Sequence, residues 1–372
     1  MRLVTVLRTG LTAILCITLL ASCGGEQEQL PDWSQIPVTN VTGIEYKINT
    51  DFFYFINPLR VYGDNIGIGN VYSGIYNYGV AQFRGDSAVM IEGICRRGQG
   101  PGEFVYSSFG VKNDSTLLIL SENGAGPRAM FEVPMNPYPD MDYKTWKTYG
   151  MDRINQKDGT GLRISGNDFI YLGDSRILFT GTPYSEENHI FTVLDYKTQT
   201  YSPLEFWPDD NYEGPDAPKS SFYTINSKLL NSGKRFAYRC GEGKFALIFE
   251  IDGNKVKVIR TLFDEKPKYR AKDDKMNFGV KHANFLRLAA NDKYICAMPL
   301  EKNIDGEKKG KWNECRYGNE VYVFDWDGNP VKHLMLDHIG MAIGMLQTEN
   351  TLLLTGEDQA NNGSGIWRYA LD

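Results

Sequence analysis

Histidine is scarce in this sequence, with 4 residues in a chain of 372. That number leaves little material for a His-rich metal site or for a catalytic centre built on several histidines. The formal net charge is −6 and no region is strongly basic, which argues against nucleic acid as the main partner. Neither the C-x-x-C of a zinc ribbon nor the G-x-S-x-G turn of a serine hydrolase is present. We therefore predict no metal site, no cofactor and no catalytic residue.

Glycine and aromatic residues are abundant instead, with 38 Gly, 22 Tyr and 19 Phe. Hydrophobic residues make up 42% of the chain and charged residues 23%, which is a globular and not a disordered composition. Many Gly together with many Tyr and Phe are typical of short strands joined by tight turns.

The N-terminus carries a targeting signal. Arg2 and Arg8 precede a short apolar run over 11–20, which is followed by Leu20-Ala21-Ser22-Cys23. The run is too short for a stable transmembrane anchor. Small residues directly before a cysteine resemble the lipobox of bacterial lipoproteins. The resemblance implies that residues 1–22 are a signal peptide and that Cys23 becomes an acylated N-terminus inserted in the lipid bilayer.

Residues 23–41 are polar with two prolines and are predicted to be a flexible tether. Glu26 and Glu28 follow the acylated Cys23 closely, and an acidic stretch at this place resembles the surface-export signal of Bacteroidota lipoproteins. Solvated tether charges explain it equally well. We expect an outer-membrane lipoprotein of the cell envelope, on either its periplasmic or its surface face.

Four cysteines of the mature chain, Cys95, Cys240, Cys296 and Cys315, would lie in an oxidising compartment. They allow three full pairings. A core of this size does not depend on disulfides, so free buried thiols and a bridge both remain open.

One element recurs six times: a short apolar strand, a polar turn and a second apolar strand. The turns centre near Asp64, Asp114, Asp174, Ser232, Asp292 and Glu349. The intervals between them are 50, 60, 58, 60 and 57 residues. Such even spacing indicates an internal repeat.

A second strand–turn–strand element follows most copies, at 80–94, 191–206, 246–263 and 321–336. Four antiparallel strands in each repeat are typical of a propeller blade. The sequence therefore predicts an all-β, six-bladed β-propeller over 42–372. A β-sandwich pair is the alternative, but it would not need six equal units.

The sixth copy ends one strand short, whereas 42–49 is a lone strand near the N-terminus. We expect 42–49 to pair with the C-terminal blade and close the ring, because this removes two exposed strand edges. No stretch after the signal peptide has helical periodicity. Residues 141–154 fit either a short helix or an outer strand of the second blade.

Naming the strands of a blade a to d from the channel outwards defines two faces of the propeller. The a–b and c–d turns share one face, which we call the hairpin face. The b–c loops and the d–a connections between blades share the other, which we call the crossover face. The longer loops, including 95–108, 207–224 and 302–319, belong to the crossover face. We expect a ligand there, because long loops on a rigid scaffold are where binding usually occurs.

The most distinctive motif is Gly98-Gln99-Gly100-Pro101-Gly102-Glu103-Phe104. Its glycines and proline favour a compact turn with positive φ angles. A crossover of this kind, together with the lipobox, the tether and the six repeats, resembles the six-bladed, TolB-like propeller lipoproteins of Bacteroidota. The resemblance implies the fold and an envelope location, and no settled activity. We expect Phe104 to pack between the first two blades and Glu103 to bond backbone amides or an arginine.

Five residues are candidate ligand contacts on the crossover face: Arg96, Arg97, Glu103, His282 and Trp312. Arginine suits carboxylate or phosphate groups because its donors form a planar fork. We expect a non-catalytic binding module for a peptide, protein or glycan. The alternatives are a metal-dependent propeller hydrolase or lyase, and a structural subunit of an outer-membrane complex.

Overall fold

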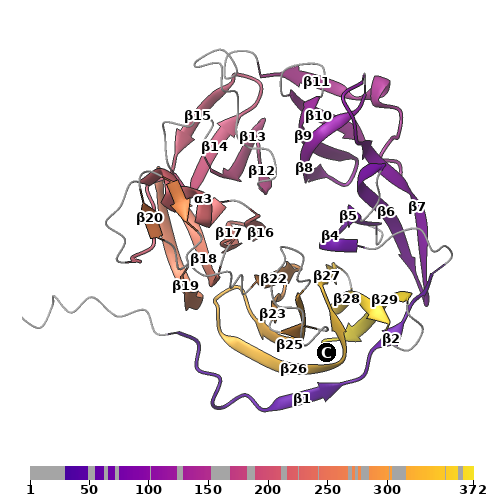
Figure 1. The fold of residues 1–372 in the computed structure, drawn as a ribbon, viewed down its shortest axis with the longest axis vertical. Coiled ribbons are helices and arrows are strands. Elements are labelled where there is room, and N and C mark those ends of the chain that lie inside the picture. Colours follow the sequence, from indigo (N-terminus) through magenta and orange to yellow (C-terminus); the bar gives the residue numbers. More distant parts are fainter. Residues whose placement is uncertain are drawn as a thin grey trace, which may run out of the picture. The chain divides into compact units, whose positions relative to one another are not determined.

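The structure is a computed structural model that describes residues 30–48, 55–62, 66–71, 75–100, 102–123, 129–151, 168–181, 189–210, 216–224, 226–241, 243–266, 270–272, 275–277, 285–300, 302–303, 316–347, 349–358 and 363–372. Residues Pro31–Asp372 form one compact unit. This unit is a six-bladed β-propeller in which each blade is an antiparallel sheet, as predicted (Figure 1). None of the helices in the described ranges is long and apolar enough to span a bilayer.

The blades follow one another along the chain, each beginning with its innermost strand. Blade 1 contains β4 (Phe55–Tyr62), β5 (Ile66–Val71), β6 (Tyr76–Arg84) and β7 (Ser87–Arg96). Blade 2 contains β8 (Phe104–Asn113), β9 (Thr116–Asn123), β10 (Ala129–Pro134) and β11 (Lys147–Gly150). Blade 3 contains β12 (Phe169–Gly173), β13 (Arg176–Thr180), β14 (Phe191–Asp195) and β15 (Thr200–Pro203).

Blades 4 to 6 complete the ring. Blade 4 contains β16 (Lys228–Ser232), β17 (Arg235–Arg239), β18 (Lys244–Asp252) and β19 (Lys255–Glu265). Blade 5 contains β22 (Phe285–Ala290), β23 (Ile295–Leu300), β25 (Arg316–Phe324) and β26 (Pro330–Gly340), with β24 (Lys302–Asn303) pairing on β25. Blade 6 supplies β27 (Ala342–Leu346), β28 (Thr351–Asp358) and β29 (Gly363–Ala370). A small hairpin, β20 (Arg270–Lys272) and β21 (Lys275–Asn277), lies in the connection between blades 4 and 5.

Five of the six predicted a–b turns lie between the strands expected of them, at Asp114, Asp174, Ser232, Asp292 and Glu349. The sixth, at Asp64, lies outside the described residues. Asp174 and Ser175 both have positive φ, at 50° and 65°. Such a pair of angles matches the twist of a tight hairpin. The hairpin conformation therefore explains why polar residues occupy this turn of the repeat.

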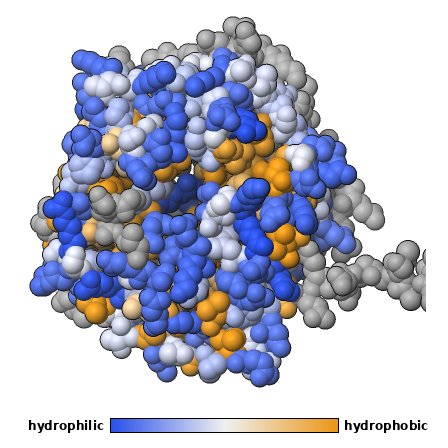
Figure 2. Space-filling model, turned by 180° about the vertical axis from the view of Figure 1, so that it is seen from behind, coloured by the Kyte–Doolittle hydropathy of each residue, from blue (hydrophilic) through white to orange (hydrophobic). Residues whose placement is uncertain are grey.

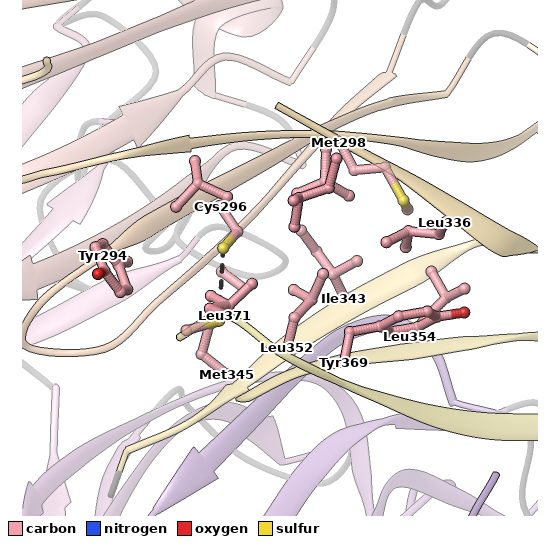
Figure 3. Packing of buried hydrophobic residues seen from close by; sticks show 14 of the residues in the cluster. Tyr294, Cys296, Met298, Leu336, Ile343, Met345, Leu352, Leu354, Tyr369 and Leu371 are labelled. Atoms are coloured by element: carbon pink, nitrogen blue, oxygen red, sulfur yellow. Dashed lines mark hydrogen bonds between the residues drawn. The ribbon is translucent and has the colours of Figure 1, made fainter. Parts of the chain in front are cut away.

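The hydrophobic core lies between adjacent blades. Each of the six buried clusters joins two neighbouring sheets. Figure 3 shows the cluster between blades 5 and 6, where Cys296 and Met298 on β23 face Ile343 and Met345 on β27. The Cys296 thiol lies 3.6 Å from the Met345 sulfur. Because every sheet packs on both sides, a closed ring leaves no packing face of a blade uncovered.

Three short strands before blade 1 close that ring on its outside. β1 (Val38–Val41) pairs in parallel with β26 of blade 5, β2 (Ile44–Glu45) pairs antiparallel with β29 of blade 6, and β3 (Lys47–Ile48) pairs in parallel with β7 of blade 1. Figure 1 shows β1 and β2 at the periphery beside β26 and β29. The predicted closure by 42–49 is therefore confirmed, and β2 is the fourth strand of blade 6.

Residues 31–41, which the sequence assigned to the tether, lie against blade 5. Trp33 packs edge-on against Tyr322 and Phe324, with ring centroids 4.8 and 5.0 Å apart. The sequence did not predict β1, because a parallel strand of four mostly exposed residues shows no alternation of apolar and polar side chains.

Two further segments refine the sequence prediction. In the crossover to blade 4, α3 (Asp216–Thr224) is a helix that the sequence did not predict. Its buried residues Phe222 and Tyr223 are adjacent, and a helix of nine residues is too short to show a period. The ambiguous segment 141–154 contains both a 3₁₀ turn, η1 (Tyr143–Thr145), and the outer strand β11.

Candidate functional site

A cavity of about 570 Å³ lies on the axis of the propeller, and the innermost strands of all six blades line it. The blades contribute, in order, Arg60, Val111, Ile170, Lys228, Leu288 and Met345. Figure 2, which views the chain from the side opposite to Figure 1, shows hydrophilic residues over much of that face and a hollow near its centre. The volume falls within the range usual for small-molecule sites.

The cavity lies toward the hairpin face. The lining residues of β4, β8, β22 and β27 come from the ends of these strands that lead into the a–b turns. The a–b turns themselves contribute Asp114 and Gln347 to its rim. Lys228, by contrast, is the first residue of β16, and Asp168 directly precedes β12. These two residues therefore lie deeper in the channel than the rim.

Arg60 crosses the channel and connects four blades. Its guanidinium is ion-paired with the Asp168 carboxylate at the start of blade 3. It also donates to the carbonyl oxygens of Phe109 in blade 2 and Leu229 in blade 4, at 3.4 and 3.3 Å. The Asp168 carboxylate in turn accepts a hydrogen bond of 2.7 Å from the Leu229 N–H. Charge-assisted bonds in such a buried setting are among the strong ones, so this bridge fixes the inner strands relative to one another.

Lys228 is the least satisfied member of this cluster. Its side chain is 2% exposed, and its Nζ lies 3.5 Å from the nearer Asp168 oxygen. No acceptor in the described part of the chain has hydrogen-bond geometry with this Nζ. Burial, together with the positive charges of Arg60 and Arg239, lowers the pKa of Lys228 well below its ordinary value, although Asp168 opposes the shift. A buried ammonium beside other cations is suited to receive an anion.

The sequence-predicted residues Arg96, Arg97 and Glu103 lie elsewhere, and none of them lines this cavity. The exposed Arg96 lies 3.6 Å from Glu103, and the exposed Arg97 donates to Asn77 at 3.0 Å. Glu103 accepts a hydrogen bond of 2.9 Å from the Gly100 N–H. The three residues therefore lie in the crossover from β7 to β8, and their role toward a ligand stays a prediction.

The glycine-rich crossover has the packing role that its composition indicated. Phe104 is 1% exposed and stacks on Trp146 of blade 2, with ring centroids 5.7 Å apart. Gly102 has a φ of +75°, and a Cβ there would overlap the ring of Tyr143. The compact turn therefore places Phe104 in the core between blades 1 and 2.

Three further candidates, Cys23, His282 and Trp312, lie outside the described residues. His333 and His338 are held by neighbouring carboxylates, at 2.7 Å from Glu320 and 2.8 Å from Asp337. Within the described ranges, no group of three or more His, Cys, Asp or Glu side chains is arranged to hold a metal ion.

Three of the four cysteines that follow Cys23 are buried in the core: Cys95, Cys240 and Cys296. Cys315 lies among the residues that the structure does not describe. Burial raises the pKa of Cys95 to about 12 and also raises that of Cys296. Because the thiolate is the reactive form, the raised pKa lowers the reactivity of the Cys95 and Cys296 thiols at neutral pH.

The sequence does contain an indication of the cluster formed by Arg60, Asp168 and Lys228. The prediction from loop length did not use it. Four of the innermost strands carry a cation: Arg60 in β4, Lys112 in β8, Lys228 in β16 and Arg287 in β22. A charge in the innermost strand of a propeller has few places to point other than the channel or a neighbouring blade. The sequence analysis instead placed the ligand on the crossover face, because the long loops lie there, and this is the opposite face of the ring.

Comparisons with known proteins support the fold. A crystal structure of a member of the DUF4221 family from Bacteroides vulgatus superposes with a TM-score of 0.55 at 11% identity, covering 91% of this chain and 98% of that one. The WD40 repeats of RRP9 give 0.45 at 8% identity, over 90% and 99% of the two chains. A gluconolactonase from Xanthomonas campestris gives 0.44 at 13% identity, over 87% of each. No family model and no curated protein sequence matches the chain. The first likeness shows the propeller fold alone.

Proposed function

We propose that this chain is an envelope-anchored binding module and that its peptide, protein or glycan ligand inserts into the axial cavity. The observation that carries the proposal is the cavity of about 570 Å³ to which all six blades contribute. A rigid ring of packed sheets positions its walls, and such preorganisation favours binding. Long connections around a fixed scaffold can extend the contact surface.

Filling the cavity tests this function. Ala290 lines the cavity and is partly buried against the core between blades 4 and 5. Ala290→Trp should obstruct the cavity, and a thermal melt of this variant without ligand checks that the fold remains. Ala370 at the end of β29 is exposed, and Ala370→Trp is the matched control. We expect the purified mature chain and the control to be stabilised against heat by fractions of an envelope extract, and Ala290→Trp to lose most of that stabilisation.

A variant that replaces both Arg96 and Arg97 by Ala distinguishes the two candidate locations. Both side chains are exposed, so their loss should leave the fold intact. Retained binding in this variant and lost binding in Ala290→Trp locate the ligand at the axis. The reverse pattern would return the site to the crossover face and contradict the axial proposal.

Membrane anchoring through Cys23 is the second part of the proposed function. Cys23→Ala should move the protein from the membrane fraction to the soluble fraction, because acyl chains are the anchor that the lipobox implies. Intact mass of the membrane-bound protein should show removal of residues 1–22 and added acyl groups. A Cys23→Ala protein that still partitions with membranes would refute this part.

A further inference from the structure

Two buried polar atoms at the cavity have no hydrogen-bond partner in the described part of the chain. They are Nζ of Lys228 and the phenolic oxygen of Tyr62. Both residues line the cavity, on β16 and β4. Nearly all buried polar groups in proteins are hydrogen-bonded, and an unmet one costs free energy. Two unmet donors at one cavity indicate a bound group that supplies acceptors.

The charge balance around the cavity indicates what kind of acceptor it is. Arg60 and Lys228 are the cations among its described lining residues, and both approach the single carboxylate of Asp168. The lining residue Asp114 is exposed in an a–b turn and does not neutralise the deeper cluster. Arg239 also acts on Lys228 but does not line the cavity. The lining cations and Asp168 together leave one unit of positive charge. A singly charged carboxylate balances it, whereas a phosphate dianion exceeds it.

Part of the cavity wall is apolar. Ile170, Leu288 and Met345 are buried side chains that line it from blades 3, 5 and 6. Apolar walls around a few convergent polar groups are the usual design of a small-molecule site. Such walls stabilise a hydrocarbon body by removing it from water.

We infer that the ammonium of Lys228 and the hydroxyl of Tyr62 bind the carboxylate of a small organic acid or of a peptide C-terminus, whose apolar body packs against the cavity wall. This inference rests on the proposed function, because it gives the ligand of the same cavity a chemical class. The Arg60–Asp168 bridge holds both donors in place and is itself already paired. Binding therefore needs no rearrangement of the bridge.

The first experiment compares acids with their uncharged amides on the unaltered mature chain. Hexanoate is titrated against hexanamide, and the peptide Ala-Leu-Leu against the same peptide with an amidated C-terminus, by isothermal calorimetry. We expect each acid to bind at least tenfold more tightly than its amide. Binding of hexanoate alone identifies a free acid as the source, and binding of the peptide alone identifies a C-terminus. Both outcomes support the shared carboxylate chemistry.

The second experiment removes each donor. Lys228→Met and Tyr62→Phe keep the size of the side chain and abolish the hydrogen bond. We expect at least a tenfold loss of affinity for the acid in the first and about a threefold loss in the second, with amide affinity unchanged. Lys255→Met is the matched control, since it removes the same charge from an exposed side chain of β19 outside the cavity. It should bind the acid normally.

Several results would overturn the inference. They are equal binding of acid and amide, unchanged acid affinity in Lys228→Met or in Tyr62→Phe, and stronger binding of inorganic phosphate than of hexanoate. Absence of any binding by the acids overturns it as well. The acid–amide comparison needs no variant, so it decides even if one variant fails to fold. If the acids fail while Ala290→Trp still loses envelope-extract binding, the cavity remains the site and only the carboxylate class is wrong.

Discussion

Removal of residues 23–50, so that the chain begins at Asp51, should cost about 5 kcal/mol of stability or more. The deletion takes away β1, β2 and β3, which pair with blades 5, 6 and 1. It also removes Tyr46, which is 3% exposed in the core between blades 6 and 1. Blade 6 would then expose its strand β29 as an open edge, which invites aggregation. We expect the melting temperature to fall by roughly 10–20 °C.

A shorter truncation is the control for this experiment. A chain that begins at Pro31 lacks only the first part of the tether and keeps Trp33 against Tyr322 and Phe324. Its melting temperature should equal that of the mature chain. Tyr46→Ala should have an intermediate effect, because Tyr46 contacts Phe83 at a centroid distance of 5.3 Å and its N–H donates to Ile366. An unchanged melting temperature for the chain from Asp51 would disprove closure by these strands.

Closure was predictable because it follows from counting. Six repeats leave the last blade one strand short, and a lone apolar segment at the other end of the chain is the natural partner. The parallel strands β1 and β3 were not predictable in the same way. Each adds two to four residues to a blade that already has its four strands. Counting the strands of the repeats therefore does not predict them.

The axial site was harder to predict, for a physical reason. Arg60, Asp168 and Lys228 are far apart in sequence, and only the closed ring brings them together. A lone Arg or Lys in an apolar strand has many structural explanations. The glycine-rich crossover, in contrast, is a local motif, so its packing role around Phe104 was readable from neighbouring residues.

Asp168→Ala should destabilise the protein by about 3–5 kcal/mol, the range for removing one partner of a buried ion pair. The substitution leaves Arg60 and Lys228 as buried cations without this carboxylate, and it removes the acceptor of the Leu229 N–H. Chemical denaturation at pH 7 measures the loss. Asp86→Ala is the control: Asp86 pairs with Lys47, but both side chains are largely exposed. Surface pairs of this kind contribute little, so that variant should unfold almost like the parent.

Lys228→Met should increase the stability of the protein, in contrast to Asp168→Ala, and the size of this increase should depend on pH. The pKa of Lys228 in the fold is lowered by burial and by the charges of Arg60 and Arg239, and Asp168 opposes the shift only in part. An unfolded lysine keeps its proton up to about pH 10.4. Between the lowered pKa and that value the unfolded chain binds more protons than the folded one, so stability rises with pH. Below the lowered pKa both states are protonated and this slope disappears.

The measurement is the free energy of unfolding of the parent and of Lys228→Met at several pH values between 6 and 9.5. The parent should gain stability with rising pH relative to the variant, by at most about 1.4 kcal/mol per pH unit for one proton. Arg287, whose pKa burial and Arg239 lower to about 9, contributes its own slope to both proteins and so cancels in the difference. At pH 6 the variant should be the more stable protein, because it no longer buries a charge. Parallel curves for the two proteins would mean that Lys228 keeps its proton in the folded as well as the unfolded chain over this whole pH range, which would contradict a lowered pKa for its ammonium in the fold.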